Sequence, residues 1–312
     1  MHFDLPLPVK DLNSNTFNGE NTIILAGMGR SGTTWAADII NYEKNYRIIF
    51  EPFFPSKVKE AKGFEYLQYL NPGCKDIALT HQAKTILSGE LRNSWVDKDE
   101  SALHLRQRII KDIRCNLMLG WLKATFKRVQ VVLVVRHPLQ VVDSWRKLGW
   151  GGEYQGKSSD LEIILAQQSL IEDFPVIKYV MKEIDFGDFM ERTLFQWCIF
   201  HLVPMNHLKK DQAHTVFYEN LVLKPEEEVK RLFEHLKLPF HGEEIAGVLS
   251  NSSSTNFQHR VWPRDKKQLI SGWRRGFTAI QIERVNSILK LFNLDRLYDK
   301  NGYPALKHAF QS

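Results

Sequence analysis

A strand, a glycine-rich turn and a helix follow one another directly in the stretch TIILAGMGRSGTTWAADII, residues 22–40. Residues 22–27 are apolar and β-rich, as a buried strand requires, and residues 32–44 have the composition of a helix. A strand that feeds a helix N-terminus through glycines favours an anion, because the first N–H groups of the helix are free and its dipole is positive there. The stretch therefore predicts an α/β fold with a phosphate or sulfate site at the turn.

The turn nearly matches the pattern of nucleotide-triphosphate loops, G-x-x-x-x-G-K-[ST]. Gly27, Gly32 and Thr34 occupy their expected places, but Thr33 stands where the phosphate-binding lysine belongs. A magnesium-dependent kinase would also supply an aspartate after a later apolar strand, whereas the strand VQVVLVV ends here in Arg136. The pattern therefore favours an anion site of another kind, with a plain strand-to-helix turn as the alternative.

A dinucleotide site is the second interpretation of the same turn. Gly27, Gly29 and Gly32 match G-x-G-x-x-G, and Glu51 ends the next strand, where such a site places an acid for the ribose. A dehydrogenase is therefore an alternative. Four phosphate-seeking side chains lie in or beside the turn: Arg30, Ser31, Thr33 and Thr34. This density of donors is greater than a dinucleotide turn needs, and it favours a gripped terminal phosphate or sulfate.

A second glycine-rich loop, GGEYQGKS at 151–158, satisfies the triphosphate pattern in full. The segment before it, VVDSWRKLGW, has the pattern of a helix and a turn, whereas the motif is meaningful only between a strand and a helix. We interpret residues 151–158 as a surface loop, with a mobile lid as its functional variant.

The composition is that of a globular protein that needs neither a metal nor a disulfide to hold its core. The chain has 312 residues, of which 43% are hydrophobic, so a large core is possible. Three widely spaced cysteines, Cys74, Cys115 and Cys198, indicate neither a disulfide framework nor a zinc site. We therefore expect a reducing, cytoplasmic location.

The charge and the N-terminus narrow the range of partners. A net charge of +6 suits an anionic ligand but is too small to argue for nucleic acid. The N-terminus has no basic head followed by an apolar run, and no window approaches the roughly 20 apolar residues of a membrane span. We expect no membrane span and no nucleic-acid partner, and the oligomeric state stays open.

Short apolar runs alternate with longer helical stretches along the chain. The runs TIILAG, YRIIF, RIIKDI, VQVVLVV and HTVFY are each followed by a helical pattern, which indicates parallel strands joined by crossover helices. Residues 149–210 lack a strand pattern and are predicted to be a helical insertion. We expect an N-terminal extension at 1–20, one domain at 21–300 and a C-terminal tail at 301–312.

A second candidate anion site lies in RHPLQVVDSW. Arg136 and Ser144 are eight residues apart, across a strand end and the first turns of a helix that Pro138 can open. Both side chains could face one phosphate, the arginine as a bidentate charged clamp and the serine as a directional donor.

Together, the turn and this clamp resemble the sulfotransferases that use 3′-phosphoadenosine 5′-phosphosulfate. GRSGTTWA looks like their 5′-phosphosulfate loop, with Arg30 where cytosolic members have lysine, and VVRHPLQVVDSW looks like their 3′-phosphate strand, loop and helix. VFYENLVLKPEEEVKRLFEHLKLP is similar to the later strand and helix of the family, with Tyr218 near the adenine position. SGWRRGFT is similar to its C-terminal loop, so the resemblance runs from about 22 to about 290.

The resemblance implies a single-domain, three-layer fold like that of P-loop nucleotide triphosphatases, with a central parallel sheet. It also implies 3′-phosphoadenosine 5′-phosphosulfate as the donor and no metal ion, because no phosphoryl group is transferred. The residues implied in donor binding are Arg30, Ser31, Gly32, Thr33, Thr34, Trp35, Arg136, Ser144 and Tyr218. Of these, Arg30 would also stabilise the charge on the departing phosphate.

The catalytic base is where the sequence departs from the cytosolic members. Those members follow the middle strand with Lys-Thr-His and use the histidine as base, whereas Asp112 and Ile113 stand in the corresponding places here. RIIFEPFF instead puts Glu51 just past the second strand, much like the glutamate of carbohydrate and tyrosylprotein sulfotransferases. We predict Glu51 as the base, and the alternatives are a structural glutamate paired with Arg47 or Lys57, or a histidine base. The histidines considered for that role are His81, His104 and His137.

The C-terminal Arg-Lys-Gly that holds the 3′-phosphate in the cytosolic members has no good copy here. By distance from Trp273, Lys266 and Lys267 fall where the Arg and Lys belong, and Arg264 or Arg274 are the alternatives. The combined hypothesis is a sulfotransferase that acts on a hydroxyl of a small molecule or glycan. The alternatives are the dehydrogenase and a catalytically inactive adenine-nucleotide-binding protein.

Overall fold

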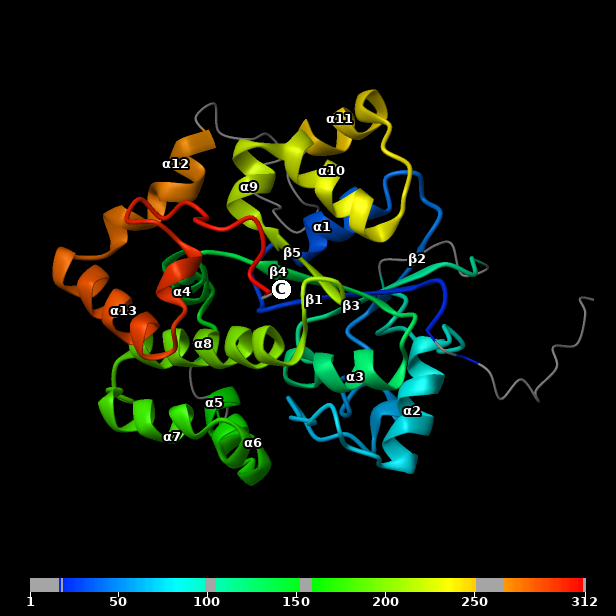
Figure 1. Ribbon diagram of the computed structural model, residues 1–312, viewed down its shortest axis with the longest axis horizontal. Helices are drawn as coiled ribbons and strands as arrows, with labels where there is room; N and C mark the ends of the chain where they lie inside the picture. The colour runs from blue at the N-terminus through cyan, green and yellow to red at the C-terminus, as the bar shows by residue number, and fades with distance from the viewer. Residues whose placement is uncertain (1–16, 18, 99–104, 152–158, 251–265, 311–312) are drawn as a thin grey trace, which may run out of the picture.

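The computed structural model describes residues 17, 19–98, 105–151, 159–250 and 266–310 (Figure 1). A parallel sheet with the strand order β2-β3-β1-β4-β5 lies at its centre. The strands are β1 (Thr22–Gly27), β2 (Arg47–Phe50), β3 (Arg108–Asp112), β4 (Gln130–Val135) and β5 (Ala213–Phe217). The predicted α/β class with a central parallel sheet is confirmed, and each strand lies within one residue of the apolar run that predicted it.

The strand order separates this sheet from that of a dinucleotide-binding domain. In the latter, the second strand lies beside the first. Here β3 lies between them and pairs with both β1 and β2. Glu51, which follows β2, is therefore two strands away from the glycine turn, and the topology argues against the dehydrogenase alternative.

Helices cover both faces of the sheet (Figure 1). One face, which includes Ile23 and Leu25 of β1, packs against one set of helices. This set is α1 (Thr33–Ile40), α9 (Tyr218–Leu223), α10 (Pro225–Leu236), α11 (Gly242–Ser250) and α12 (Lys266–Ser271). Because strand side chains alternate between faces, Ile24 and Ala26 of β1 belong to the core on the other face.

The second face and the region beyond it hold the remaining helices. They are α2 (Ile77–Leu87), α3 (Leu119–Thr125), α4 (Pro138–Leu148), α5 (Asp160–Leu165), α6 (Gln168–Asp173), α7 (Pro175–Val180), α8 (Phe189–His207) and α13 (Ala279–Leu291). The described part of the predicted insertion, 159–210, is helical as expected, with one long α-helix, α8, three short α-helices and the 3₁₀ helix Met181–Glu183. No helix in the described ranges combines the length and the apolar character that crossing a membrane demands.

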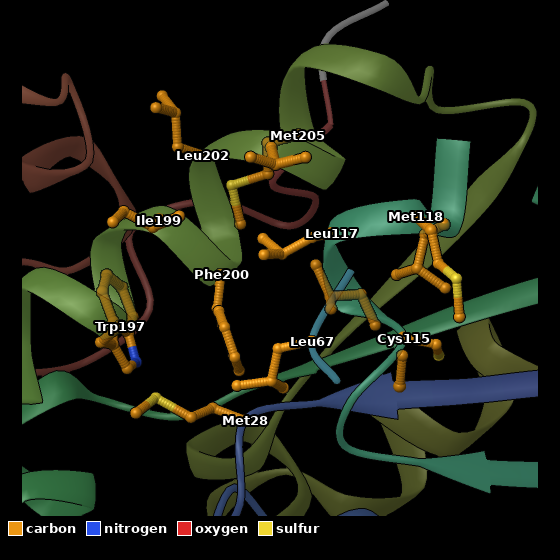
Figure 2. Packing of buried hydrophobic residues seen from close by; sticks show 14 of the residues in the cluster. Met28, Leu67, Cys115, Leu117, Met118, Trp197, Ile199, Phe200, Leu202 and Met205 are labelled. Carbon is orange, nitrogen blue, oxygen red and sulfur yellow. The ribbon is translucent and has the colours of Figure 1, made fainter. Parts of the chain in front are cut away.

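The long helix α8 anchors the glycine turn to the core. Figure 2 shows Phe200 of α8 pointing toward Leu67 and toward Met28, the first residue of the turn. Met28 is 0% exposed. A close-packed interior restricts the movement of its members, so the turn begins from a fixed point.

Buried histidines make the stability of the fold sensitive to acid. His201 on α8 places Nδ1 2.7 Å from the carbonyl oxygen of Trp197, and burial lowers its pKa to about 4. Burial, then His235 and His308, lower the pKa of His214 to about 3. Below pH 6.5 the unfolded chain binds protons that the folded chain does not. The stabilisation is therefore complete above pH 6.5 and is lost as the pH falls toward these values.

We expect the His201→Phe variant to lose less stability than the wild type between pH 7.5 and 5.5. The ring shape is kept while one titrating group is removed, so the difference should be about 1.4 kcal/mol in the free energy of unfolding. Urea denaturation at the two pH values measures it. Equal losses in both proteins would show that His201 is protonated alike in the folded and unfolded states.

Candidate active site

The turn between β1 and α1 is built to receive an anion. Arg30 and Gly32 both have left-handed backbone conformations, with φ of 72° and 97°. Gly32 is the N-cap of α1 and no side chain caps the helix, so its first N–H groups point outward uncapped. The Oγ of Ser31 is buried and has no hydrogen-bond partner among the described residues. A polar atom left this way in a buried turn indicates a ligand that completes it.

The two predicted anion sites meet at Arg30. The Nε of Arg30 donates to the Oγ of Ser144 on α4 at 3.1 Å, and Nη1 of Arg136 donates to the carbonyl oxygen of Arg30 at 2.8 Å. Burial and then the neighbouring charge of Arg136 lower the pKa of Arg30. Two guanidinium groups therefore share one region, and an anion between them would relieve their repulsion.

Tyr218, the first residue of α9, closes the other side of this region. The guanidinium carbon of Arg136 lies 4.2 Å from the centre of the Tyr218 ring. Trp35 packs edge-on against the same ring with centroids 6.0 Å apart, and it is 2% exposed. Thr33 is buried and Thr34 half-buried in the first turn of α1. The structure thus brings together all nine residues that the resemblance assigned to the donor.

Gly32 allows Tyr218 to approach the turn, and we expect its replacement by alanine to disturb the site. A Cβ at Gly32 would lie 2.7 Å from Cδ2 of Tyr218, in addition to the strain of φ 97°. Gly149 is a matched control, because it has φ 65° but nothing within 4 Å of its Cβ. Gly149→Ala should cost about 1 kcal/mol of unfolding free energy, and Gly32→Ala at least about 2 kcal/mol. Thermal denaturation of both compares them, and equal costs would mean that Tyr218 yields freely.

A buried polar network behind Arg136 was not anticipated from the sequence. Its Nε donates to Oε1 of Gln140 at 3.0 Å, and Nε2 of Gln140 donates to Oε1 of Glu219 at 2.9 Å. The backbone N–H of His137 and the hydroxyl of Tyr298 also donate to Glu219, at 2.8 and 3.1 Å. Arg136 and Gln140 are four residues apart at a helix start, which is the one sequence signal for this contact.

Glu51 lies in the predicted place but has a different partner from those considered. It directly follows β2, is 6% exposed, has φ 42° and forms an ion pair with Arg114. Arg47, one of the considered partners, binds Asp97 instead, at 2.5 Å. Arg114 follows β3, the strand that pairs with β2, so the carboxyl ends of neighbouring strands bring the two side chains together.

Asp112 and an aromatic cluster hold this second half of the site. The carboxylate of Asp112 accepts backbone N–H groups of Phe53, Arg114 and Cys115 at 2.9, 2.6 and 3.1 Å. Burial raises its pKa to about 6. It therefore ties the loop after β2 to the loop after β3. The guanidinium of Arg114 lies 4.1 Å from the Phe54 ring centre.

The site forms a row along the carboxyl edge of the sheet. Its members follow the strand order: Glu51 after β2, Arg114 after β3, the turn after β1, Arg136 after β4 and Tyr218 after β5. One half of this row carries a carboxylate that can accept a proton, and the other half carries a cationic cradle for an anion. Ligands of open α/β sheets bind outside this edge.

A tryptophan lies over the middle of the row. A Cβ at Gly29 would lie 3.0 Å from Cζ3 of Trp150, which is 42% exposed. Nε1 of Trp145 donates to the carbonyl oxygen of Gly29 at 2.9 Å. The indoles are T-shaped with centroids 5.9 Å apart. Both helix α4 and the residues after it therefore help to hold the turn. The second glycine-rich loop, 151–158, lies outside the described residues apart from its first glycine.

The other predicted residues lie less close to this row. His137 stacks on Trp273, with ring centroids 4.5 Å apart, and burial lowers its pKa to about 3, so a base role for it is not favoured. His81 is exposed on α2, and His104 and Arg264 lie outside the described residues. Lys266 and Lys267 are exposed at the start of α12. Arg274 is near enough to His137 to lower its pKa.

Several known proteins are similar to this chain. The sequence model of the sulfotransferase domain matches residues 20–301. Cytosolic sulfotransferase 15 of Arabidopsis thaliana is 25% identical over 301 residues, covering 86% of this chain and 71% of that protein. The sulfotransferase domain of the curacin biosynthetic pathway has a TM-score of 0.49 at 17% identity, covering 86% of this chain and 96% of that one. The corresponding domain of the Synechococcus PCC 7002 olefin synthase has 0.48 at 17%, covering 87% and 92%.

Proposed function

This chain belongs to the family of sulfotransferases that use 3′-phosphoadenosine 5′-phosphosulfate, and we propose that it sulfates an acceptor hydroxyl with Glu51 as the base. The acceptor is a small molecule or a glycan, and the reaction is an in-line displacement. We place the enzyme in the cytoplasm, a proposal supported by its similarity to a cytosolic sulfotransferase.

The single observation that carries this proposal is the contact between the two anion sites. Arg136 donates to the backbone of Arg30, and Arg30 donates to Ser144. One bisphosphorylated nucleotide can therefore place its 5′-phosphosulfate at the turn and its 3′-phosphate at Arg136 and Ser144. Tyr218 supplies an aromatic surface for adenine, and buried Trp35 packs edge-on against its ring. The uncapped start of α1 and the buried Oγ of Ser31 fit the 5′-phosphate.

The proposed chemistry uses groups at both halves of the row. The acceptor oxygen forms a bond to sulfur while its proton passes to Glu51. The bond between sulfur and the bridging phosphate oxygen breaks, and its electron pair leaves with the bisphosphate. Arg30, Thr33 and Thr34 stabilise that developing charge, and fixed donors of this kind need no rearrangement during the reaction. The ion pair with Arg114 engages Oε2 of Glu51, and we assign the proton to Oε1.

We expect 3′,5′-bisphosphoadenosine to raise the melting temperature and NAD at equal concentration to raise it little. A ligand present at 100 times its Kd adds about 2.7 kcal/mol to the stability of the folded state. For a chain of 312 residues, this is a shift of roughly 4 °C. A larger shift with NAD would favour the dehydrogenase.

Mass spectrometry tests whether the protein transfers a sulfuryl group. Cell extracts incubated with the protein and the donor should contain products that have gained one SO₃ group. If no product forms over a broad panel of acceptors, the inactive binding protein is favoured.

A further inference from the structure

We infer that Gln140 and Glu219 are positioning residues that fix Arg136 for the 3′-phosphate, and so set the preference for a 3′-phosphorylated donor. This inference rests on the proposed function, because it concerns one subsite of the donor. Neither residue would touch the reacting sulfur.

The amide of Gln140 is held in one orientation by three contacts. Its Nε2 donates both to Glu219 and to the carbonyl oxygen of Ile270, each at 2.9 Å. The amide oxygen must therefore face the other way, where it accepts from Nε of Arg136. A flipped amide would turn an NH₂ group toward the arginine and lose all three hydrogen bonds.

Glu219 fixes the nitrogen end of that amide. It is 0% exposed, and both carboxylate oxygens accept hydrogen bonds, Oε1 from His137 and Gln140 and Oε2 from Tyr298. Burial raises its pKa to about 7. A buried carboxyl group is costly unless it is fully bonded. Glu219 bonds the backbone after β4, Gln140 on α4 and the hydroxyl of Tyr298. These bonds hold the loop that carries Arg136.

The result is an arginine with only part of its fork engaged. Nε is bound by Gln140, Nη1 by the carbonyl oxygen of Arg30, and the guanidinium plane lies over Tyr218. Among the contacts of the described residues, Nη2 has none, and we assign it to the 3′-phosphate. An arginine held this way does not have to be ordered when the ligand binds.

Calorimetric titration with two ligands tests this role. The ratio of the Kd for adenosine 5′-monophosphate to the Kd for 3′,5′-bisphosphoadenosine reports only the contribution of the 3′-phosphate. In Gln140→Leu the contact to Arg136 is gone, and the ratio should fall roughly 3- to 10-fold. In Gln140→Asn the side chain is one carbon too short for its amide to reach Arg136, so the ratio should fall by a similar factor. This variant keeps a polar side chain and serves as the test if the leucine variant does not fold.

Two further proteins complete the experiment. Gln167→Leu is the matched control, because it removes side-chain bonds to Leu67 and Tyr69, on a loop outside the carboxyl-edge row, and should leave the ratio unchanged. Glu219→Gln keeps the shape and should retain most of the ratio. With a working acceptor, the KM for the donor should rise in Gln140→Leu while kcat stays within about twofold.

The outcomes separate this inference from the function it rests on. If Gln140→Leu and Gln140→Asn weaken both ligands equally or leave the ratio intact, the positioning role is wrong while the sulfotransferase proposal stands. If the wild type itself does not prefer the bisphosphate, both the donor assignment and this inference fail.

Discussion

Replacing Glu51 with glutamine is expected to lower kcat by about 10²- to 10⁴-fold, the usual contribution of a general base. Glutamine has nearly the same shape but cannot accept the proton of the acceptor. Binding of 3′,5′-bisphosphoadenosine should change little, because Arg30, Arg136 and Ser144 are untouched. Initial rates with a working acceptor and calorimetry with the product nucleotide measure the two effects separately.

The variant also breaks the ion pair between Glu51 and Arg114, so a control is needed for structural damage. Asp97→Asn breaks a comparable ion pair, that of Asp97 with buried Arg47 at the start of β2, away from the carboxyl edge. It should lower the melting temperature yet keep kcat. If Glu51→Gln retains kcat within about threefold of wild type, Glu51 is a structural partner of Arg114 and the base lies elsewhere.

Two residues of the row share an uncommon backbone conformation. Glu51 and Arg30 are not glycine, yet both have left-handed conformations, with φ of 42° and 72°, immediately after or close after parallel strands. Such conformations cost roughly 1–3 kcal/mol each. Among the described residues they also occur at Asn21, Lys44, Leu67, Lys237 and Asn293. In both places the strain turns a charged side chain toward the carboxyl edge of the sheet.

The strands and the glycine turn could be predicted because their signals are local. A continuous apolar run such as residues 130–135 indicates a strand buried on both faces, and glycine spacing indicates the turn. The nearness of Arg136 and Ser144 could also be expected, since both lie in one strand, loop and helix. Their contact with Arg30 follows from the neighbouring positions of β1 and β4 in the sheet.

The partners of the site residues could not be predicted, because they depend on strand order. Arg114 contacts Glu51 only because β3 pairs with β2. The sequence alone does not say which strands are neighbours in the sheet. Glu219 has the sequence context of an ordinary glutamate at the start of a helix, and the hydroxyl that bonds its Oε2 belongs to Tyr298, 79 residues later. Long-range contacts between polar residues leave no periodic pattern to detect.

Arg30→Gly is expected to separate activity from stability. The guanidinium at the turn is assigned to the charge that develops on the leaving phosphate, and the loss of one such preorganised donor typically lowers kcat by about 10²- to 10³-fold. Arg30→Lys, which restores the residue that cytosolic members carry, should recover most of this loss because the positive charge is kept.

The unliganded Arg30→Gly protein should nevertheless melt no lower than the wild type. Glycine adopts a φ of 72° without strain, and the repulsion between Arg30 and Arg136, one of the causes that lower the pKa of Arg30, is removed. The backbone effect should lie within about 1 kcal/mol.

Lys44→Gly is the matched control, because Lys44 is exposed with φ 60° and lies outside the row. The Lys44→Gly protein should show the same backbone effect on stability and retain full kcat. A fall in melting temperature in Arg30→Gly but not in Lys44→Gly would mean that Arg30 holds the empty turn together, through Ser144, and that its charge is not primarily kept for catalysis.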